Sequence, residues 1–489
     1  MEFSHPFPPA SPDSPSADRV APLVRFTCRI REAMSKPIVV IHFDINKTIL
    51  MSDIASGRSI KETMNAILSE CVWGVVDLAS KPFEERTIED WKMHPDQNPF
   101  HTFIPPPVNK EGEEFMTLGT FLEDHTAVPK SEQRTFKRNF TKKGFIGETF
   151  ADSCEQLERH LTIDKEAMEG ISSMLQKSDT HSAVATLLQG GYYHLLPSFF
   201  KLVESLNEKK QKGLLDFRIL FRTYGHDISN VVAEHNLYCS GEHPLFSRSR
   251  VPLAAADDSI PSNYSYPPIP PSETLDMRWL AMRKEHQGKL VRVAVDEASV
   301  VLSSSIAGRA LSDSIETDTC ACYWSNISER EQWEQGVILQ CKNNKNISGS
   351  GDIRGARAIQ KVILGDWLGL PGFTDSDDLS PLNNKKDFSY VAAVQDDFHW
   401  WFNRGEADEQ GKLFMVQREG QGQTEIVQVF FDDNIERDRA HIVDVRDAFT
   451  FEPVAFAEAV SKGMLRRVEP LMAIADDDYY GTYFCSLHT

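Results

Sequence analysis

The chain has 489 residues, of which 41% are hydrophobic and 25% are charged, and its formal net charge at pH 7 is −20. This surplus of acidic residues excludes a protein that covers nucleic acid with a basic surface, and eight cysteines are too few for a disulfide scaffold. No apolar run reaches the roughly 18 residues of a membrane span, so we expect no membrane partner. The length allows several domains, or one core with large insertions.

Residues 1–36 are rich in proline and serine and contain no apolar segment of the kind found in secretory signals. A segment of this composition cannot bury enough apolar surface to offset the entropy lost on ordering. We therefore expect a disordered tail over 1–36, a folded region over 37–489 and a cytoplasmic location.

The first predicted strand is the apolar run Ile38–Phe43, which is followed at once by the polar sequence Asp44-Ile-Asn-Lys-Thr48. A continuous apolar run rich in β-branched residues indicates a strand buried on both faces of a parallel sheet. Open α/β sheets bind ligands at the carboxyl ends of their strands, so these polar residues indicate a site. The alternative is that Asp44 or Asn46 only caps the next helix. That helix is predicted over Ser59–Trp73, which suggests the first half of a β-α-β unit.

After this helix, proline-rich pieces and a basic stretch interrupt the regular pattern of strands and helices. We therefore interpret residues 75–185 as a cap-like insertion into the core. Helical spacing of apolar residues predicts helices over Phe150–Leu161 and Lys165–Leu175. The basic stretch Lys130–Lys143 has two interpretations. It is either a solvated helix face or a group of charges that steers an anionic substrate.

The core resumes with a helix over Tyr192–Lys209, in which Pro197 marks a kink or the start, and a buried strand over Phe217–Phe221. That strand ends at Thr223 and precedes another predicted helix. Residues 238–386 form a second predicted insertion. Its glycine-rich segment 348–355 lacks the spacing of a dinucleotide-binding loop, so we favour a flexible loop over a nucleotide site.

The last third of the chain returns to regular alternation of strands and helices. Its predicted elements are an aromatic-rich helix over Asp396–Gly405, a strand or helix edge containing Lys412–Val416, a strand over Ile426–Phe431 that ends in Asp432-Asp433, a strand over His441–Val445 and a helix over Val454–Met464.

The polar ends of these strands are expected to meet at one edge of a parallel sheet, although nearly the whole chain separates them. Asp44, Asp432 and Asp433 together supply hard oxygen ligands, which suit Mg²⁺, and without a cation they would repel one another. A carboxylate can also attack phosphorus and form an aspartyl-phosphate. Lys412 is positioned in the sequence to orient Asp44, and Thr223 to hold phosphoryl oxygens.

These motifs, in this order, resemble those of the haloacid dehalogenase-like (HAD) superfamily of phosphatases and phosphotransferases. The resemblance implies an α/β fold with a doubly wound parallel sheet and cap insertions that set substrate choice. It also implies roles for individual residues: Asp44 as nucleophile and metal ligand, the carbonyl of Asn46 with Asp432 and Asp433 as further metal ligands, Lys412 as a catalytic residue, and Thr48 and Thr223 as substrate ligands.

The chain departs from the family pattern at Asn46, where hydrolases of this superfamily have an aspartate that protonates the leaving group and activates water. An amide does neither, and general acid–base catalysis contributes about 10²–10⁴-fold to rate. We expect Mg²⁺-dependent phosphoryl chemistry on a small phosphorylated substrate or a phosphoprotein. The alternative is a weak or inactive relative that binds a phosphate ligand or a protein partner. The oligomeric state cannot be read from the sequence.

Overall fold

The computed structural model describes residues 36–51, 59–94, 114–174, 179–225, 227–239, 243–246, 300–304, 337–341, 352–354, 391–396, 411–418, 424–435 and 442–484, with a few positions between 360 and 421. Almost all of the predicted tail lies outside these residues. So do most of the predicted insertion over 238–386 and all of the segment 348–355 except 352–354.

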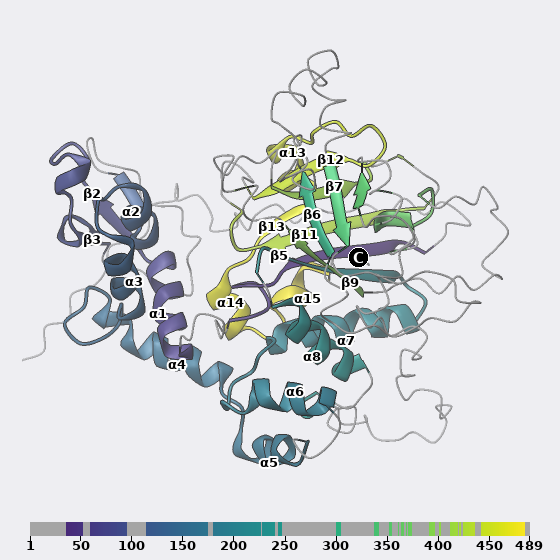
Figure 1. Ribbon diagram of the computed structural model, residues 1–489, viewed down its shortest axis with the longest axis horizontal. Helices are drawn as coiled ribbons and strands as arrows, with labels where there is room; N and C mark the ends of the chain where they lie inside the picture. Colours follow the sequence, from purple (N-terminus) through teal and green to yellow (C-terminus); the bar gives the residue numbers. More distant parts are fainter. Residues whose placement is uncertain are drawn as a thin grey trace, which may run out of the picture.

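A mixed sheet of eight strands forms the centre of the molecule, in the order β13-β11-β1-β5-β9-β6-β7-β8 (Figure 1). Every neighbouring pair from β13 to β6 is parallel, and β7 and β8 extend the sheet in antiparallel fashion. The predicted α/β class with a parallel sheet is therefore confirmed. The strands are β1 (Ile38–Asp44), β5 (Asp216–Thr223), β6 (Val300–Ser304), β7 (Val337–Cys341), β8 (Asp352–Arg354), β9 (Val391–Asp396), β11 (Ile426–Asp432) and β13 (Leu465–Arg467).

One face of the central strands is covered by helices (Figure 1). Phe43 of β1 packs edge-on against Phe199 and Tyr480, with ring centroids 5.5 and 5.3 Å apart. Pro197 is the first residue of its helix, because a proline there loses no helical hydrogen bond. The helices on this face are α7 (Pro197–Gln211), α8 (Ile228–Cys239), α14 (Pro470–Ala475) and α15 (Tyr479–Phe484).

The opposite face is covered mainly by a second, two-stranded parallel sheet, in which β10 (Lys412–Val416) pairs with β12 (Val443–Asp447). Phe414 of β10 lies 4.7 Å from the ring of His42 on β1. The short helix α13 (Phe456–Ser461) confirms the predicted helix near the C-terminus with narrower bounds. This side differs from the helix layer that a doubly wound sheet usually carries on each face.

The segment 391–396 corrects one prediction. An aromatic-rich helix was expected over Asp396–Gly405, but Asp396 is the last residue of β9, which pairs with both β5 and β6. The rest of that predicted helix lies outside the described residues, except Trp401, which is helical. The run Val-Ala-Ala-Val is short and only weakly β-forming by itself, and its pairing between two other strands decides its conformation.

Most of the elements between β1 and α7 form a group of helices around a small antiparallel sheet, β3-β2-β4 (Figure 1). The helices predicted over 150–161 and 165–175 are confirmed as α4 and α5. The group contains α1 (Ile60–Cys71), β2 (Trp73–Val76), β3 (Lys92–Met93), β4 (Glu114–Thr117), α2 (Leu118–Asp124), α3 (Lys130–Arg138) and α4 (Ala151–Leu161), with short 3₁₀ turns at Phe83–Glu85, Ile88–Asp90 and Glu148–Phe150. The helices α5 (Lys165–Met174) and α6 (Asp179–Leu188) instead share a hydrophobic cluster with α8 of the core (Figure 1).

Helix α1 belongs to this group, so the prediction that it opens a β-α-β unit is wrong. The strand that follows it, β2, pairs with β3 and β4 in antiparallel fashion and, among the described strands, not with the main sheet. Asn65 of α1 accepts hydrogen bonds from the backbone N–H of Thr141 (2.6 Å) and from its hydroxyl (2.8 Å). The N-cap of α1 is Ser59, in a capping box with Glu62. Neither Asp44 nor Asn46 caps this helix, which removes the alternative explanation for them.

Within the described part of the chain, no helix combines the length and the apolar character needed to cross a membrane.

Candidate metal and phosphate site

The site lies at β1, the strand at which the chain changes the side of the main sheet to which it adds further strands. After β1 the chain adds β5 and then β9 on one side, whereas β11 and β13 lie on the other side of β1. Open α/β sheets bind ligands outside the carboxyl ends of their strands at such a switch point. Asp44 is the last residue of β1, and Asp432 is the last residue of β11. The sequence-predicted strand ends therefore meet at the position where a ligand is expected.

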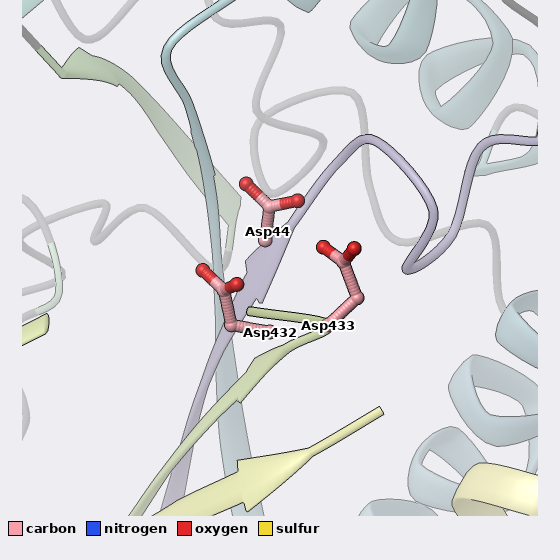
Figure 2. Close-up of side chains that lie close together, drawn as sticks. All are labelled: Asp44, Asp432 and Asp433. Atoms are coloured by element: carbon pink, nitrogen blue, oxygen red, sulfur yellow. The ribbon is translucent and has the colours of Figure 1, made fainter. Parts of the chain in front are cut away.

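Three carboxylates converge there from these two neighbouring strands (Figure 2). Asp44, Asp432 and Asp433 each offer an oxygen, and the three atoms lie within 4.8 Å of one another. Asp44 is 6% exposed and Asp432 is fully buried. Such a set of hard oxygen donors suits Mg²⁺, with water or a phosphate completing the coordination.

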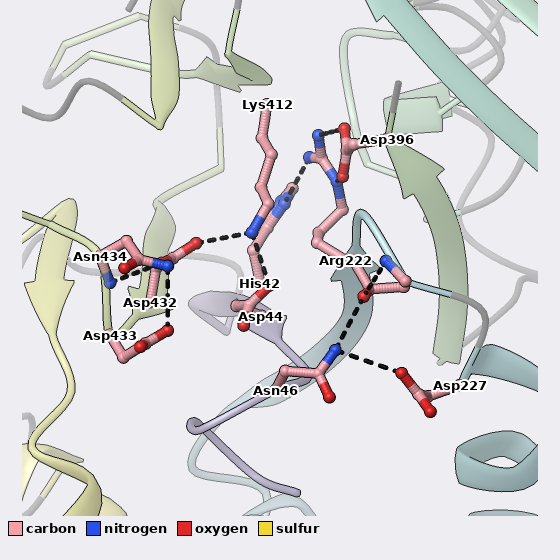
Figure 3. Close-up of polar contacts among 12 residues, drawn as sticks. His42, Asp44, Asn46, Arg222, Asp227, Asp396, Lys412, Asp432, Asp433 and Asn434 are labelled. Carbon is pink, nitrogen blue, oxygen red and sulfur yellow. Dashed lines mark hydrogen bonds and ion pairs between the residues drawn. The ribbon is translucent and has the colours of Figure 1, made fainter. Parts of the chain in front are cut away.

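Lys412 lies between two of the carboxylates (Figure 3). Its Nζ is 2.5 Å from Oδ1 of Asp44 and 2.7 Å from Oδ2 of Asp432. It is the first residue of β10, the strand that packs across the sheet, and its side chain is 1% exposed. Lys412 thus directly contacts the aspartate predicted as nucleophile.

The charges of this cluster do not balance. Burial raises the pKa of Asp44 despite the opposing charge of Lys412, and burial likewise raises the pKa of Asp433 to about 7. Burial disfavours the Lys412 ammonium, but Asp432 and Asp44 outweigh this and raise its pKa. Lys412 contacts two of these three carboxylates and does not neutralise the set, and a divalent cation would supply the charge that is missing.

These shifts predict that Mg²⁺ competes with protons. Because the pKa values of Asp44 and Asp433 are raised, a bound cation must displace protons from them. The affinity should therefore fall as the pH drops below about 7, by up to about tenfold per pH unit for each proton displaced. Calorimetric titration in buffers of different protonation enthalpy measures this proton release directly. An affinity that is constant across neutral pH would contradict the prediction.

Asn46 lies on the other side of Asp44 from Lys412 (Figure 3), and its side chain contacts Thr223. The Asn46 side-chain amide donates to Oδ2 of Asp227 at 3.2 Å and contacts Oγ1 of Thr223 at 3.5 Å. Oγ1 of Thr223 also accepts the N–H of Gly225 at 2.8 Å. A Cβ at Gly225 would lie 2.8 Å from the Asp227 carboxylate, so only glycine leaves these groups their present positions.

Thr48, the remaining predicted substrate ligand, makes no hydrogen bond with any of these groups. Its side chain is completely buried, and its hydroxyl has no hydrogen-bond partner among the described residues. Its carbonyl accepts the hydroxyl of Tyr480 at 2.7 Å, which ties the loop after β1 to α15. The structure therefore supports a role of Thr48 in holding this loop, and its role in substrate binding stays a prediction.

Comparison with known proteins does not assign the chain to a family. No model of a known protein family matches it, and neither a curated protein nor a solved structure shows a significant match. The resemblance to the HAD superfamily therefore depends on the motif residues alone.

A buried ion pair beside the cluster was missed in the sequence. Arg222 binds both carboxylate oxygens of Asp396, at 2.5 and 3.0 Å, and donates to the carbonyl of Leu413 in β10 at 2.9 Å. Arg222 is the register partner of Asp44, so its side chain lies on the same face of the sheet. The signal that could have revealed this ion pair is the position of Arg222. An arginine directly after the apolar run Phe217–Phe221, inside a strand predicted to be buried, requires a buried partner for its charge.

Two further residues support the structure around the cluster. Asn434 holds the loop after β11, because its N–H donates to Oδ1 of Asp432 at 2.9 Å and its amide contacts Asp433 at 3.3 Å. His42 is a core histidine, stacked 5.4 Å from Phe430, with a pKa that burial lowers. Its Nδ1 lies 3.4 Å from the Arg222 guanidinium, while its Nε2 has no hydrogen-bond partner among the described residues.

Proposed function

We propose that the chain is a HAD-like protein that binds Mg²⁺ through Asp44, Asp432 and Asp433 and transfers a phosphoryl group through Asp44. The observation that carries the proposal is the contact of Lys412 with two aspartates, one of which lies 368 positions away in the sequence. Catalysis by positioning and electrostatics requires this combination of nucleophile, cation site and fixed ammonium.

In this proposal, one oxygen of Asp44 attacks phosphorus and the bond to the leaving group breaks. Lys412 holds the other oxygen of Asp44 in place. A cation held by Asp44, Asp432 and Asp433 would neutralise charge on the phosphoryl oxygens. Water then releases phosphate from the aspartyl-phosphate. The amide of Asn46 cannot donate a proton to the leaving group, so substrates whose leaving group needs no protonation, such as acyl phosphates, suit this site best.

A second candidate is a protein that binds a phosphate ligand with little or no turnover. The observation that favours it is the hydrogen bond of Asn46 to Asp227, which holds an amide where hydrolases of the superfamily have an acid. Both candidates require the same cation and phosphate site. They differ only in whether the aspartyl-phosphate forms and is released.

Beryllium fluoride tests the shared part of the proposal, because it mimics a phosphoryl group on an aspartate. The wild-type protein should bind it only with Mg²⁺ present, and Asp44→Ala should abolish the binding. Asp152→Ala, which removes an exposed aspartate of α4, is the control and should bind normally. Absence of binding by the wild-type protein with any divalent metal would refute the proposed function.

A further inference from the structure

Lys47 is a second cation beside the acidic cluster, and the mechanism above does not use it. It lies in the loop after β1 with φ at 58°, the left-handed conformation that residues with a Cβ rarely adopt. Its N–H donates to the carbonyl of Leu50 at 2.8 Å, so the turn is held by the backbone. A strained residue in the loop that follows Asp44 directly and carries Asn46 is a candidate for a functional role.

The Lys47 ammonium lies between the acidic cluster and the group of helices around α1. Its Nζ is 2.6 Å from Oε2 of Glu70, near the end of α1. Its charge also reaches Asp433: burial raises the pKa of that carboxyl, and Lys47 is the strongest influence opposing the rise. Lys47 therefore pairs with Glu70 and follows Asn46 directly in the chain, so its charge lies near the proposed metal site.

Accessibility separates Lys47 from Lys412. The side chain of Lys412 is 1% exposed and is engaged by two carboxylates, whereas that of Lys47 is 36% exposed. An incoming anion can reach Lys47 without displacing a buried ion pair. Of these two cations at the cluster, Lys47 is the one open to a ligand.

Glu70 does not depend on Lys47 alone for its charge compensation. Lys137 of α3 contacts Oε1 of Glu70 at 3.4 Å and also pairs with Glu123 of α2. If Lys47 moved to another anion, Glu70 would keep an ammonium beside it. A phosphate dianion near pH 7 carries up to about twice the charge of a carboxylate, so it would compete effectively for Lys47.

We propose that Lys47 binds the phosphate group of the substrate, and that Glu70 occupies this lysine when no substrate is present. The inference depends on the proposed function and adds to it the residue that recognises a phosphate dianion. It also means that the ion pair between Glu70 of α1 and the loop after β1 opens when substrate binds.

Binding of inorganic phosphate in the presence of Mg²⁺ tests this proposal. Neutralising Lys47 and neutralising Glu70 are expected to change the affinity for phosphate in opposite directions. Lys47→Met should weaken phosphate binding by about tenfold or more, whereas Glu70→Gln should strengthen it several-fold. Lys47→Arg should keep most of the affinity. As a control, Lys81→Met breaks another ion pair, between Lys81 and Asp90, and should not change phosphate binding.

A purely structural ion pair predicts a different result. Lys47→Met and Glu70→Gln would then weaken phosphate binding together or leave it unchanged, and either outcome overturns the proposal. Lys47→Met should bind Mg²⁺ alone at least as well as the wild type, because a positive charge near Asp433 is removed. Thermal unfolding of each variant checks folding, and the Lys47→Arg variant preserves the test if the methionine variant unfolds. If the wild type binds no phosphate with Mg²⁺, the proposed function fails as well.

Discussion

Replacing Lys412 by methionine is expected to lower the free energy of unfolding by about 3–5 kcal/mol in the absence of divalent cations. The substitution keeps most of the buried volume but removes the ammonium that contacts Asp44 and Asp432 at 2.5 and 2.7 Å. Two buried carboxylates then face each other without a counter-charge. Urea unfolding measures the loss.

The response of this variant to Mg²⁺ distinguishes a cation site from an ordinary buried ion pair. Mg²⁺ should stabilise Lys412→Met more than the wild type, because the cation then supplies the only positive charge between the two aspartates. A ligand at a hundred times its dissociation constant stabilises by about 2.7 kcal/mol. Lys462→Met removes a lysine that is 42% exposed and should change stability little. Equal stabilisation of wild type and Lys412→Met by Mg²⁺ would contradict the account.

Asn46→Asp is expected to raise turnover of alkyl phosphate monoesters by about 10²–10⁴-fold, because it supplies the missing general acid and base. Asp227, whose carboxylate lies 3.2 Å from the Asn46 amide, should assist. A like charge at this distance raises the pKa of one carboxyl of the pair and keeps a proton available for the leaving group. Release of phosphate under steady-state conditions measures the gain.

The choice of substrate provides an internal control for this experiment. An acyl phosphate needs little protonation of its leaving group, so its cleavage rate should change much less in Asn46→Asp. Asn230→Asp adds the same charge at an exposed position of α8 and should leave both rates unchanged. No gain for Asn46→Asp, together with an inert wild type, would favour the binding protein over the enzyme.

The strands that carry the site were predictable because they are buried on both faces. All seven residues of β1 and of β11 are buried, so each reads as an apolar run with a polar end. Parallel pairing then brings Asp44 and Asp432 to the same edge of the sheet. Lys412 was predicted only by its order in the chain, because a lysine at the start of a short strand has no signal of its own.

The surroundings of the site were not predictable, because they depend on how distant elements pack together. Helix α1 has a regular apolar stripe, and this periodicity does not say whether the stripe faces the main sheet or α2, α3 and α4. The strand β9 is recognisable only through its two neighbours in the sheet. The contact between Lys47 and Glu70 likewise depends on where α1 packs. Each of these features is set by tertiary contacts rather than by local pattern.

The measurement that tests the central claim most directly is a crystal structure of the wild-type protein with Mg²⁺ and beryllium fluoride. The account predicts one cation with oxygen ligands from Asp44 and from the Asp432–Asp433 pair at about 2.0–2.1 Å, and beryllium bonded to the other oxygen of Asp44. Lys412 should remain in contact with Asp44. A cation bound elsewhere, or three aspartates with no cation at saturating Mg²⁺, would contradict the account.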